Sequence, residues 1–253
     1  MDFAHALRDA DGGPLVFARA DRGEVSHETS PHSHARGQLI GCERGVITVG
    51  TEVGTWVVPS RHAVWLPPHH EHSGRTNGPF SGWSLYVAKP ACAALHAQTC
   101  TLPVSPLLRE AALRSAAWGL RELDAPSLHI AQVIVDEIAR AKPQPLGLAM
   151  PRDERLVKVA RALLENPADA RGLDAWARFA GVSSRTLGRR FVAETSLTFT
   201  EWCQRARLLR GLELLAAETP VTTVAFELGY RSISAFSALF KRTFGVTPSA
   251  YFA

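Results

Sequence analysis

Residues 221–248, VTTVAFELGYRSISAFSALFKRTFGVTP, decide how the C-terminal part of this chain folds. The stretch predicts a helix over 221–228 that ends at Gly229 and a second helix over 233–244. Glycine tolerates the left-handed conformation that ends a helix, and a serine such as Ser232 caps the free amides of the next helix. Two short helices joined by a tight turn indicate a helix-turn-helix.

The same design occurs once more, earlier in the chain. Residues 173–180 predict a helix that Gly181 ends, and a second helix is expected from Arg185 to Glu194. Between the two units, residues 200–217 predict one long helix that spans roughly 27 Å at 1.5 Å per residue. With the flanking turns this length approaches the repeat of one DNA turn, about 34 Å. The separation therefore fits two units that meet neighbouring turns of a duplex.

The second helix of the first unit has one core face and one exposed face. Leu187 and Phe191 lie four residues apart and face the core, which leaves the opposite side open to a partner. The predicted DNA contacts of this unit are Ser184, Arg185, Gly188, Arg189 and Arg190. Arg185 and Arg189 are the candidates for guanine edges, and Ser184 or Arg190 is expected nearer to phosphate.

The matching helix of the second unit presents a smaller and less polar surface. Phe236, Phe240 and Phe244 take its core face. The predicted DNA contacts of this unit are Arg231, Ser232, Ser234, Ser237, Lys241 and Arg242. We expect the first unit to supply most of the direct base readout and the second to depend more on phosphate contacts. A merely solvated basic face is the alternative.

Charge is distributed unevenly along the 253 residues, whose formal net charge is +4. Residues 146–253 carry 15 basic and 10 acidic side chains, whereas residues 1–145 carry 13 and 14. The basic residues of the C-terminal part are 13 arginines and two lysines, and arginine suits bidentate phosphate or base contacts. The pattern favours double-stranded DNA as a partner.

Composition and hydropathy limit the other classes of protein. Hydrophobic residues make up 46% of the chain and charged residues 21%, which excludes a wholly disordered or collagen-like protein. Because no run of about 18 apolar residues occurs and the N-terminus lacks an export-signal pattern, we expect a cytoplasmic protein with no membrane partner.

The C-terminal part, over roughly residues 150–253, resembles the AraC/XylS family of transcription regulators. The segments that carry the resemblance are 177–183 (ARFAGVS), 185–191 (RTLGRRF), 207–215 (RLLRGLELL) and 224–249 (VAFELGYRSISAFSALFKRTFGVTPS). The resemblance implies a pair of helix-turn-helix units that enter successive major grooves, usually at a promoter. Two departures stand out: Ala238 lies where members often carry a polar or basic reader, and the chain ends in Tyr251-Phe252-Ala253.

The first hundred residues contain short β-type runs separated by glycine and proline, which suggests a small barrel or sandwich. Residues 103–140 then show two amphipathic helices. We therefore predict an α+β protein: a cupin-like sensor barrel over 1–100, a helical linker and dimerisation element over 101–145, and an all-α domain with two helix-turn-helix motifs over 146–253. The expected assembly is a homodimer.

Three histidines and a glutamine form a candidate metal site in the barrel. His32, His34 and Gln38 would share one face of a continuous strand, and His72 could join them from a later strand. Neutral imidazoles with one oxygen donor suit Zn, Ni, Fe or Mn. The spacing resembles the cupin pattern, except that Gln38 replaces the usual glutamate. A pocket that binds an organic effector, or a hydrogen-bonded cluster, is the alternative.

Four aromatic residues could wall an effector cavity: Trp56, Trp65, Trp83 and Tyr86. Ordinary core packing is the alternative for each. The function we expect is a DNA-binding transcription regulator that senses a small-molecule or metal effector through its barrel, by population shift, and that is not an enzyme. A metal-dependent cupin enzyme with an attached DNA-binding domain is the second hypothesis, and the missing carboxylate at Gln38 argues against it.

Overall fold

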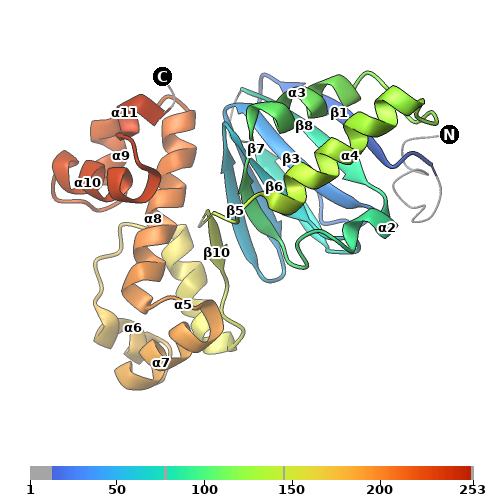
Figure 1. The fold of residues 1–253 in the computed structure, drawn as a ribbon. Coiled ribbons are helices and arrows are strands. Elements are labelled where there is room, and N and C mark those ends of the chain that lie inside the picture. The colour runs from blue at the N-terminus through green and yellow to red at the C-terminus, as the bar shows by residue number, and fades with distance from the viewer. Residues whose placement is uncertain (1–12, 77–78, 145, 252–253) are drawn as a thin grey trace. The chain divides into compact units, whose positions relative to one another are not determined.

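The computed structural model describes residues 13–76, 79–144 and 146–251. It divides into two compact units: the chain passes from the first to the second between Gly147 and Leu148, and the short segment Val53–Thr55 is grouped with the second. The helices predicted over 101–145 belong to the same unit as the β-strands. The N-terminal unit is a two-sheet β-structure with helices and the C-terminal unit is helical, which confirms the predicted fold class (Figure 1).

The strands form two antiparallel sheets over the described residues, and all of them except β10 and the start of β5 lie wholly in the N-terminal unit. The first sheet has the order β1-β8-β3-β6-β9 and the second β10-β5-β4-β7-β2. Their bounds are β1 (Val16–Gly23), β2 (His27–Glu28), β3 (Gly37–Arg44), β4 (Val46–Thr51), β5 (Gly54–Pro59), β6 (His62–Leu66), β7 (His72–Thr76), β8 (Phe80–Val87), β9 (Cys100–Pro103) and β10 (Gly147–Ala149).

Strand alternation gives the first sheet two different buried faces. In β3, Gln38 is paired with Tyr86 of β8, and the next residue, Leu39, is paired with Leu85. Because successive side chains point to opposite faces, Gln38 and Leu39 lie on opposite sides of the sheet. The side that carries Ile40 and Leu66 packs with Val49 and Val58 of the second sheet. The core of the β-structure therefore lies between the two sheets.

The other side of the first sheet is covered by helices, as Figure 1 shows. The N-terminal unit contains α2 (Lys89–Cys92), α3 (Pro106–Ser115) and α4 (Ala125–Arg140). Ser105 and Asp124 cap α3 and α4 through hydrogen bonds to Leu108 N and Ser127 N. Leu108 and Ala111 of α3 and Ile134 and Ile138 of α4 are buried in one core cluster with residues of the sheet.

The C-terminal unit holds the two predicted helix-turn-helix motifs. Its helices are α5 (Glu154–Glu165), α6 (Leu173–Phe179), α7 (Ser184–Thr195), α8 (Phe199–Ala216), α9 (Val221–Glu227), α10 (Ile233–Phe244) and α11 (Pro248–Tyr251). Gly181 and Gly229 have φ angles of 67° and 78°, the left-handed conformation expected after α6 and α9. The motifs α6–α7 and α9–α10 are thereby confirmed.

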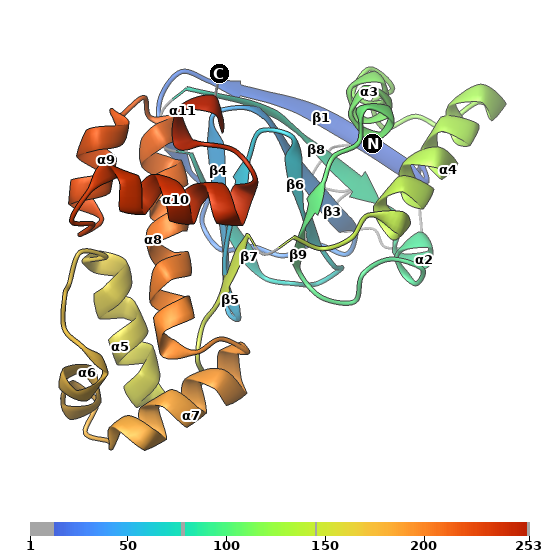
Figure 2. The same cartoon turned by 60° about the vertical axis from the view of Figure 1, so that its left-hand side comes forward.

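Helix α8 connects the two motifs (Figures 1 and 2). A capping box between Thr198 and Glu201 fixes its start. Near this end the ring of Phe191 from α7 lies 5.7 Å from the ring of Trp202. Toward the other end, a Cβ on Gly211 would lie 3.2–3.3 Å from Leu228 and Phe236, so α9 and α10 pack closely there. None of the helices among the described residues is both long and apolar enough to cross a membrane.

Candidate DNA-binding and effector-binding sites

The second helices of the two motifs, α7 and α10, match each other in length, in their N-terminal cap and in the positions that they bury; we call this shared pattern their frame. Each has 12 residues and begins after a serine N-cap: Ser183 accepts from Thr186 N at 3.1 Å, and Ser232 accepts from Ala235 N at 3.2 Å. Leu187 and Phe191 of α7 are fully buried, as are Phe236 and Phe240 at the matching positions of α10. The same face of each helix is therefore turned outward.

Helix α7 presents two arginines on this outward face. Arg185 and Arg189 are both exposed, and between them Gly188 leaves open space, because a Cβ built there would meet no atom within 4 Å. The structure gives Arg190 and Ser184 partners inside the unit: Arg190 forms an ion pair with Asp153, and Ser184 donates a hydrogen bond to Asp174. The contacts of these five residues with DNA stay predictions.

Helix α10 presents small side chains at the same positions. Ser234 is exposed, but its hydroxyl lies 3.1 Å from that of Ser232, and Ser237 is half-buried. The basic residues Lys241 and Arg242 are exposed in the last turn of α10, and Arg231 is exposed before its first turn. The sequence therefore located the polar residues of this motif, but the charges lie at the ends of its helix.

The predicted metal-site residues come together in the N-terminal unit. The ring centroid of His72 lies 4.4 Å from that of His32 and 5.2 Å from that of His34. His34 Nε2 lies 3.0 Å from Gln38 Oε1, and Gln38 Nε2 donates to Tyr86 Oη at 3.0 Å. We call these five residues the histidine cluster. His34, Gln38, His72 and Tyr86 are buried, and His32 is exposed.

The route by which the histidine cluster forms differs from the expected one. His32 and His34 were expected in one continuous strand with Gln38, but residues 33–36 lie outside the strands and β3 begins at Gly37. His32 is held by backbone hydrogen bonds to His72 in both directions, at 3.0 and 2.9 Å. The backbone N–H of His69 also donates to His34 O at 2.8 Å. An isolated antiparallel bridge between His32 and His72, and not the alternation of one continuous strand, therefore brings the rings together.

Backbone carbonyls fix the orientation of all three imidazoles. The Nδ1 atoms of His32, His34 and His72 lie 2.8, 2.7 and 2.9 Å from the carbonyl oxygens of Ser30, Arg36 and His70. A neutral imidazole carries one N–H, so donation from Nδ1 leaves a lone pair on Nε2. Burial lowers the pKa of His34 and lowers that of His72 to about 4, which favours the neutral rings.

The surrounding protein groups leave two hydrogen-bonding positions of the histidine cluster unsatisfied. His72 Nε2 is buried and has no hydrogen-bond partner. Both ring nitrogens of His34 face oxygen acceptors, Arg36 O and Gln38 Oε1, although a neutral ring can donate to one only. Such groups in a buried site indicate a ligand that binds there, or a Gln38 side-chain amide whose oxygen and nitrogen atoms occupy interchanged positions. No group of three His, Cys, Asp or Glu side chains in the described parts of the chain stands ready to hold a metal ion.

The structure separates the four aromatic residues that we expected around an effector. Tyr86 joins the histidine cluster, and its ring stacks on Phe17 at 4.9 Å. Trp56 lies in the core between the sheets. Trp65 and Trp83 pack in the core beneath α3 and α4, on the opposite face of the sheet from Gln38 and Tyr86, so they do not line the same site. Sequence reasoning missed Phe17, which only cross-strand pairing brings to Tyr86.

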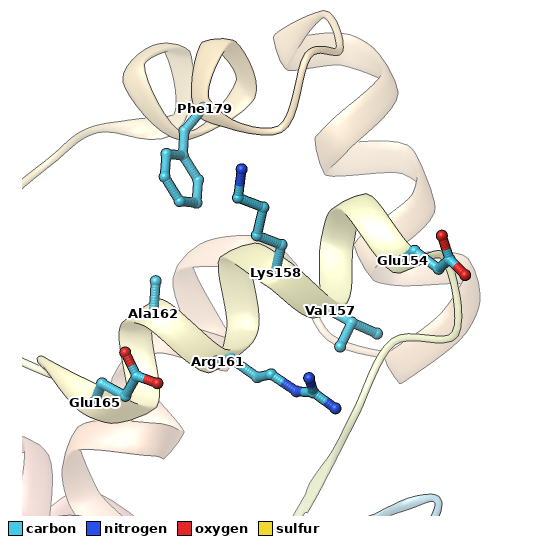
Figure 3. Close-up of a pocket in the computed structure, with 7 residues that line it drawn as sticks. All are labelled: Glu154, Val157, Lys158, Arg161, Ala162, Glu165 and Phe179. Carbon is cyan, nitrogen blue, oxygen red and sulfur yellow. The ribbon is translucent and has the colours of Figure 1, made fainter.

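Each of the two units has a pocket among its described residues. A pocket of about 380 Å³ is lined by residues of β1, including Phe17, and by the turn after α3, including Leu120. A second pocket, of about 610 Å³, lies on α5 in the C-terminal unit (Figure 3). Its residues are Glu154, Val157, Lys158, Arg161, Ala162, Glu165 and Phe179. Lys158 Nζ lies 4.6 Å from the ring centroid of Phe179 there, and none of our predicted site residues lines it.

A β-domain with a buried polar cluster, followed by two helix-turn-helix motifs, defines a transcription regulator with a ligand-binding domain. Family models agree with this class: one for an AraC-like ligand binding domain matches residues 14–140, and one for a helix-turn-helix domain matches residues 176–253. The chain belongs to the AraC family of HTH-type transcriptional regulators.

Individual relatives fit this assignment. The HTH-type transcriptional regulator NimR of Escherichia coli K12 is 34% identical over 227 residues, which cover 89% of this chain and 83% of NimR. RipA of Corynebacterium glutamicum is 36% identical over 122 residues, 48% of this chain and 35% of RipA. Among solved structures, the DNA-binding domain of AdpA in complex with a target DNA is 31% identical over 40% of this chain and 91% of that chain, with a TM-score of 0.38.

Proposed function

We propose that this regulator binds promoter DNA through α7 and α10 and that a ligand held by the histidine cluster alters its affinity for DNA. The observation that carries the DNA-binding part is the pair of 12-residue helices with one buried frame, of which α7 turns Arg185 and Arg189 outward. A ligand can act only through unequal affinity for two arrangements of the protein, so we propose a population shift. The protein then works in the cytoplasm, where promoter DNA lies.

The salt dependence of DNA affinity tests the first part. Each phosphate that a basic side chain neutralises adds about −0.9 to the slope of log K against log salt. We expect a steep slope for the full chain on a promoter fragment and a slope smaller by about 1 for Lys241→Ala. Arg140→Ala, an exposed α4 residue of the N-terminal unit, is the matched control and should keep the wild-type slope. A flat response of the wild type contradicts the proposal.

We propose a divalent transition metal, Zn, Ni, Fe or Mn, as the ligand of the histidine cluster. The unpartnered Nε2 of His72 and the two acceptors around His34 support this, because a cation bound by His34 Nε2 and Gln38 Oε1 uses both lone pairs. His32 and His72 would complete the set. When bound, the ion would supply a positive charge and Lewis acidity. We propose a binding role for the cluster, since Gln38 offers a neutral amide and not a carboxylate.

Metal content and binding heat test this assignment. Protein purified without chelator is expected to contain about one metal ion per chain, and metal-stripped protein should bind one of the four ions by calorimetry. His34→Ala with His72→Ala should abolish this binding, and His70→Ala, at an exposed ring beside the cluster, should not. If the wild type neither contains nor binds metal, the metal assignment is refuted. The Gln38 amide then donates its N–H to His34 Nε2, with its oxygen and nitrogen interchanged, and the ligand of the cluster is organic.

We also propose that the regulator is a homodimer joined through the exposed side of α3 and α4. Leu107 and Val133 are 56% and 37% exposed there, whereas Leu108, Ile134 and Ile138 of the same helices are buried. Leu107→Glu with Val133→Glu should shift the mass measured by light scattering from dimer to monomer. Val25→Glu is the control, because Val25 is exposed outside both helices. A wild-type monomer at micromolar concentration contradicts the proposal.

A further inference from the structure

The matched frame of α7 and α10 allows their outward residues to be compared one by one. Ser183 and Ser232 cap the two helices, and each helix buries its fourth and eighth residues. With the caps aligned, Arg185 of α7 corresponds to Ser234 of α10, and Arg189 corresponds to Ala238. Residues in the first half of a recognition helix are the ones that meet base edges in the major groove. The two motifs therefore present different chemistry at equivalent positions.

At the position of Arg189, the first half of α10 offers the methyl group of Ala238 in place of a guanidinium group. Ala235 and Ala238 are exposed and three residues apart, so they share one face of the helix. The Ser234 hydroxyl is engaged with Ser232 at 3.1 Å, and the positive charges of Lys241 and Arg242 lie in the last turn. Helix α7, in contrast, has no basic residue in its last turn. Charge is thus displaced toward the end of α10, where phosphates flank the groove.

We propose that the two motifs read chemically different half-sites: α7 reads guanine through Arg185 and Arg189, and α10 reads thymine through the methyl group of Ala238. The inference rests on the DNA-binding function proposed above and adds its sequence preference. Arginine pairs in bidentate fashion with guanine O6 and N7, and an alanine methyl packs on the C5-methyl group that distinguishes thymine in the major groove. Short side chains also let α10 lie close to the bases. The target is therefore asymmetric in base composition.

Single-atom changes in the DNA test this directly. Duplexes bound by the full chain are first selected from a random pool, and each thymine of the selected site is then replaced by deoxyuridine, which lacks only the methyl group. Loss of one buried methyl contact should weaken wild-type binding about fourfold at one or two thymines. In Ala238→Gly the same replacements should have no effect. For each protein variant, its affinity for the thymine duplex is divided by its affinity for the deoxyuridine duplex. A change in helix stability affects both affinities equally and cancels in this ratio.

The first half-site has a matching test. Replacement of guanine by 7-deazaguanine removes the N7 acceptor and should weaken wild-type binding at guanines in the α7 half-site but not binding by Arg189→Ala. Deoxyuridine scanning that leaves wild-type affinity unchanged, or that affects Ala238→Gly equally, overturns the inference while DNA binding stands. If the full chain binds no duplex, or binds DNA with an affinity that does not depend on salt, the proposed function itself is refuted. Failure of the base preference and failure of DNA binding are therefore distinguishable.

Discussion

Arg190 of α7 forms an ion pair with Asp153, the residue that caps the start of α5. Asp153 also accepts from Arg155 at 2.7 Å and is largely buried, so its carboxylate connects α5 and α7 within the C-terminal unit. Arg189, the next residue along α7, is exposed on the outward face. Two adjacent arginines of α7 therefore differ in their surroundings: Arg190 is paired inside the unit, and Arg189 is exposed.

Substitution of these two arginines should separate stability from DNA affinity. Arg190→Ala is expected to lower the free energy of unfolding by about 0.5–1 kcal/mol, because the ion pair is partly exposed. Arg189→Ala should leave the free energy of unfolding nearly unchanged and weaken specific DNA binding by about 1–3 kcal/mol, which is a factor of roughly 5 to 150. Urea denaturation and fluorescence anisotropy measure the two quantities. Equal effects of both substitutions on DNA affinity would refute the division of roles.

Gly188 should lower the free energy of unfolding but allow α7 to approach DNA closely. A glycine inside a helix costs about 0.5–1 kcal/mol relative to alanine, and the added Cβ would meet no protein atom within 4 Å. Gly188→Ala is therefore expected to raise the free energy of unfolding by that amount but to weaken DNA binding, since the methyl group occupies space needed for close approach. Gly211→Ala is the opposite control and should destabilise, because its Cβ would crowd Leu228 and Phe236. Unchanged DNA affinity of Gly188→Ala would contradict the close approach.

The N-terminal unit should lose stability in mild acid because of His72. Burial lowers the pKa of His72 to about 4 from 6.5, so between these values the unfolded chain binds a proton that the folded chain does not. The free energy of unfolding therefore falls as the pH drops through this window, by about 1–2 kcal/mol from pH 7 to pH 5. In EDTA, His72→Gln should show a smaller drop than the wild type. His70→Gln, with an exposed ring, should keep the wild-type drop.

Gln38→Glu should make the N-terminal unit dependent on metal. A carboxylate binds a divalent cation more tightly than an amide, but without a cation it is a buried charge beside neutral imidazoles. The variant is expected to bind the metal at least tenfold more tightly than the wild type and to melt at a lower temperature than the wild type in EDTA. Thermal melts with and without the ion measure both effects. A variant with the same metal affinity as the wild type would show that Gln38 is not a ligand.

Local signals in the sequence determined the helical unit. Gly181 and Gly229 end helices, serines at 183 and 232 cap the next ones, and buried residues four apart select the core face, so the two motifs follow from neighbours in the chain. Long-range pairing decided the rest. Asp153 lies 37 residues from Arg190, so nothing in the local pattern shows that this arginine already has a partner.

In the N-terminal unit, composition and turns predicted strands and named the histidines, but not how they meet. Residues 33–36 leave the strand, and the bridge between His32 and His72 brings the rings together. The side of the sheet on which Trp65 and Trp83 lie depends on register, because a shift of one residue moves every side chain to the other face. The sequence by itself therefore determined the element types, whereas tertiary packing decided which polar groups share a site and which are left without a partner.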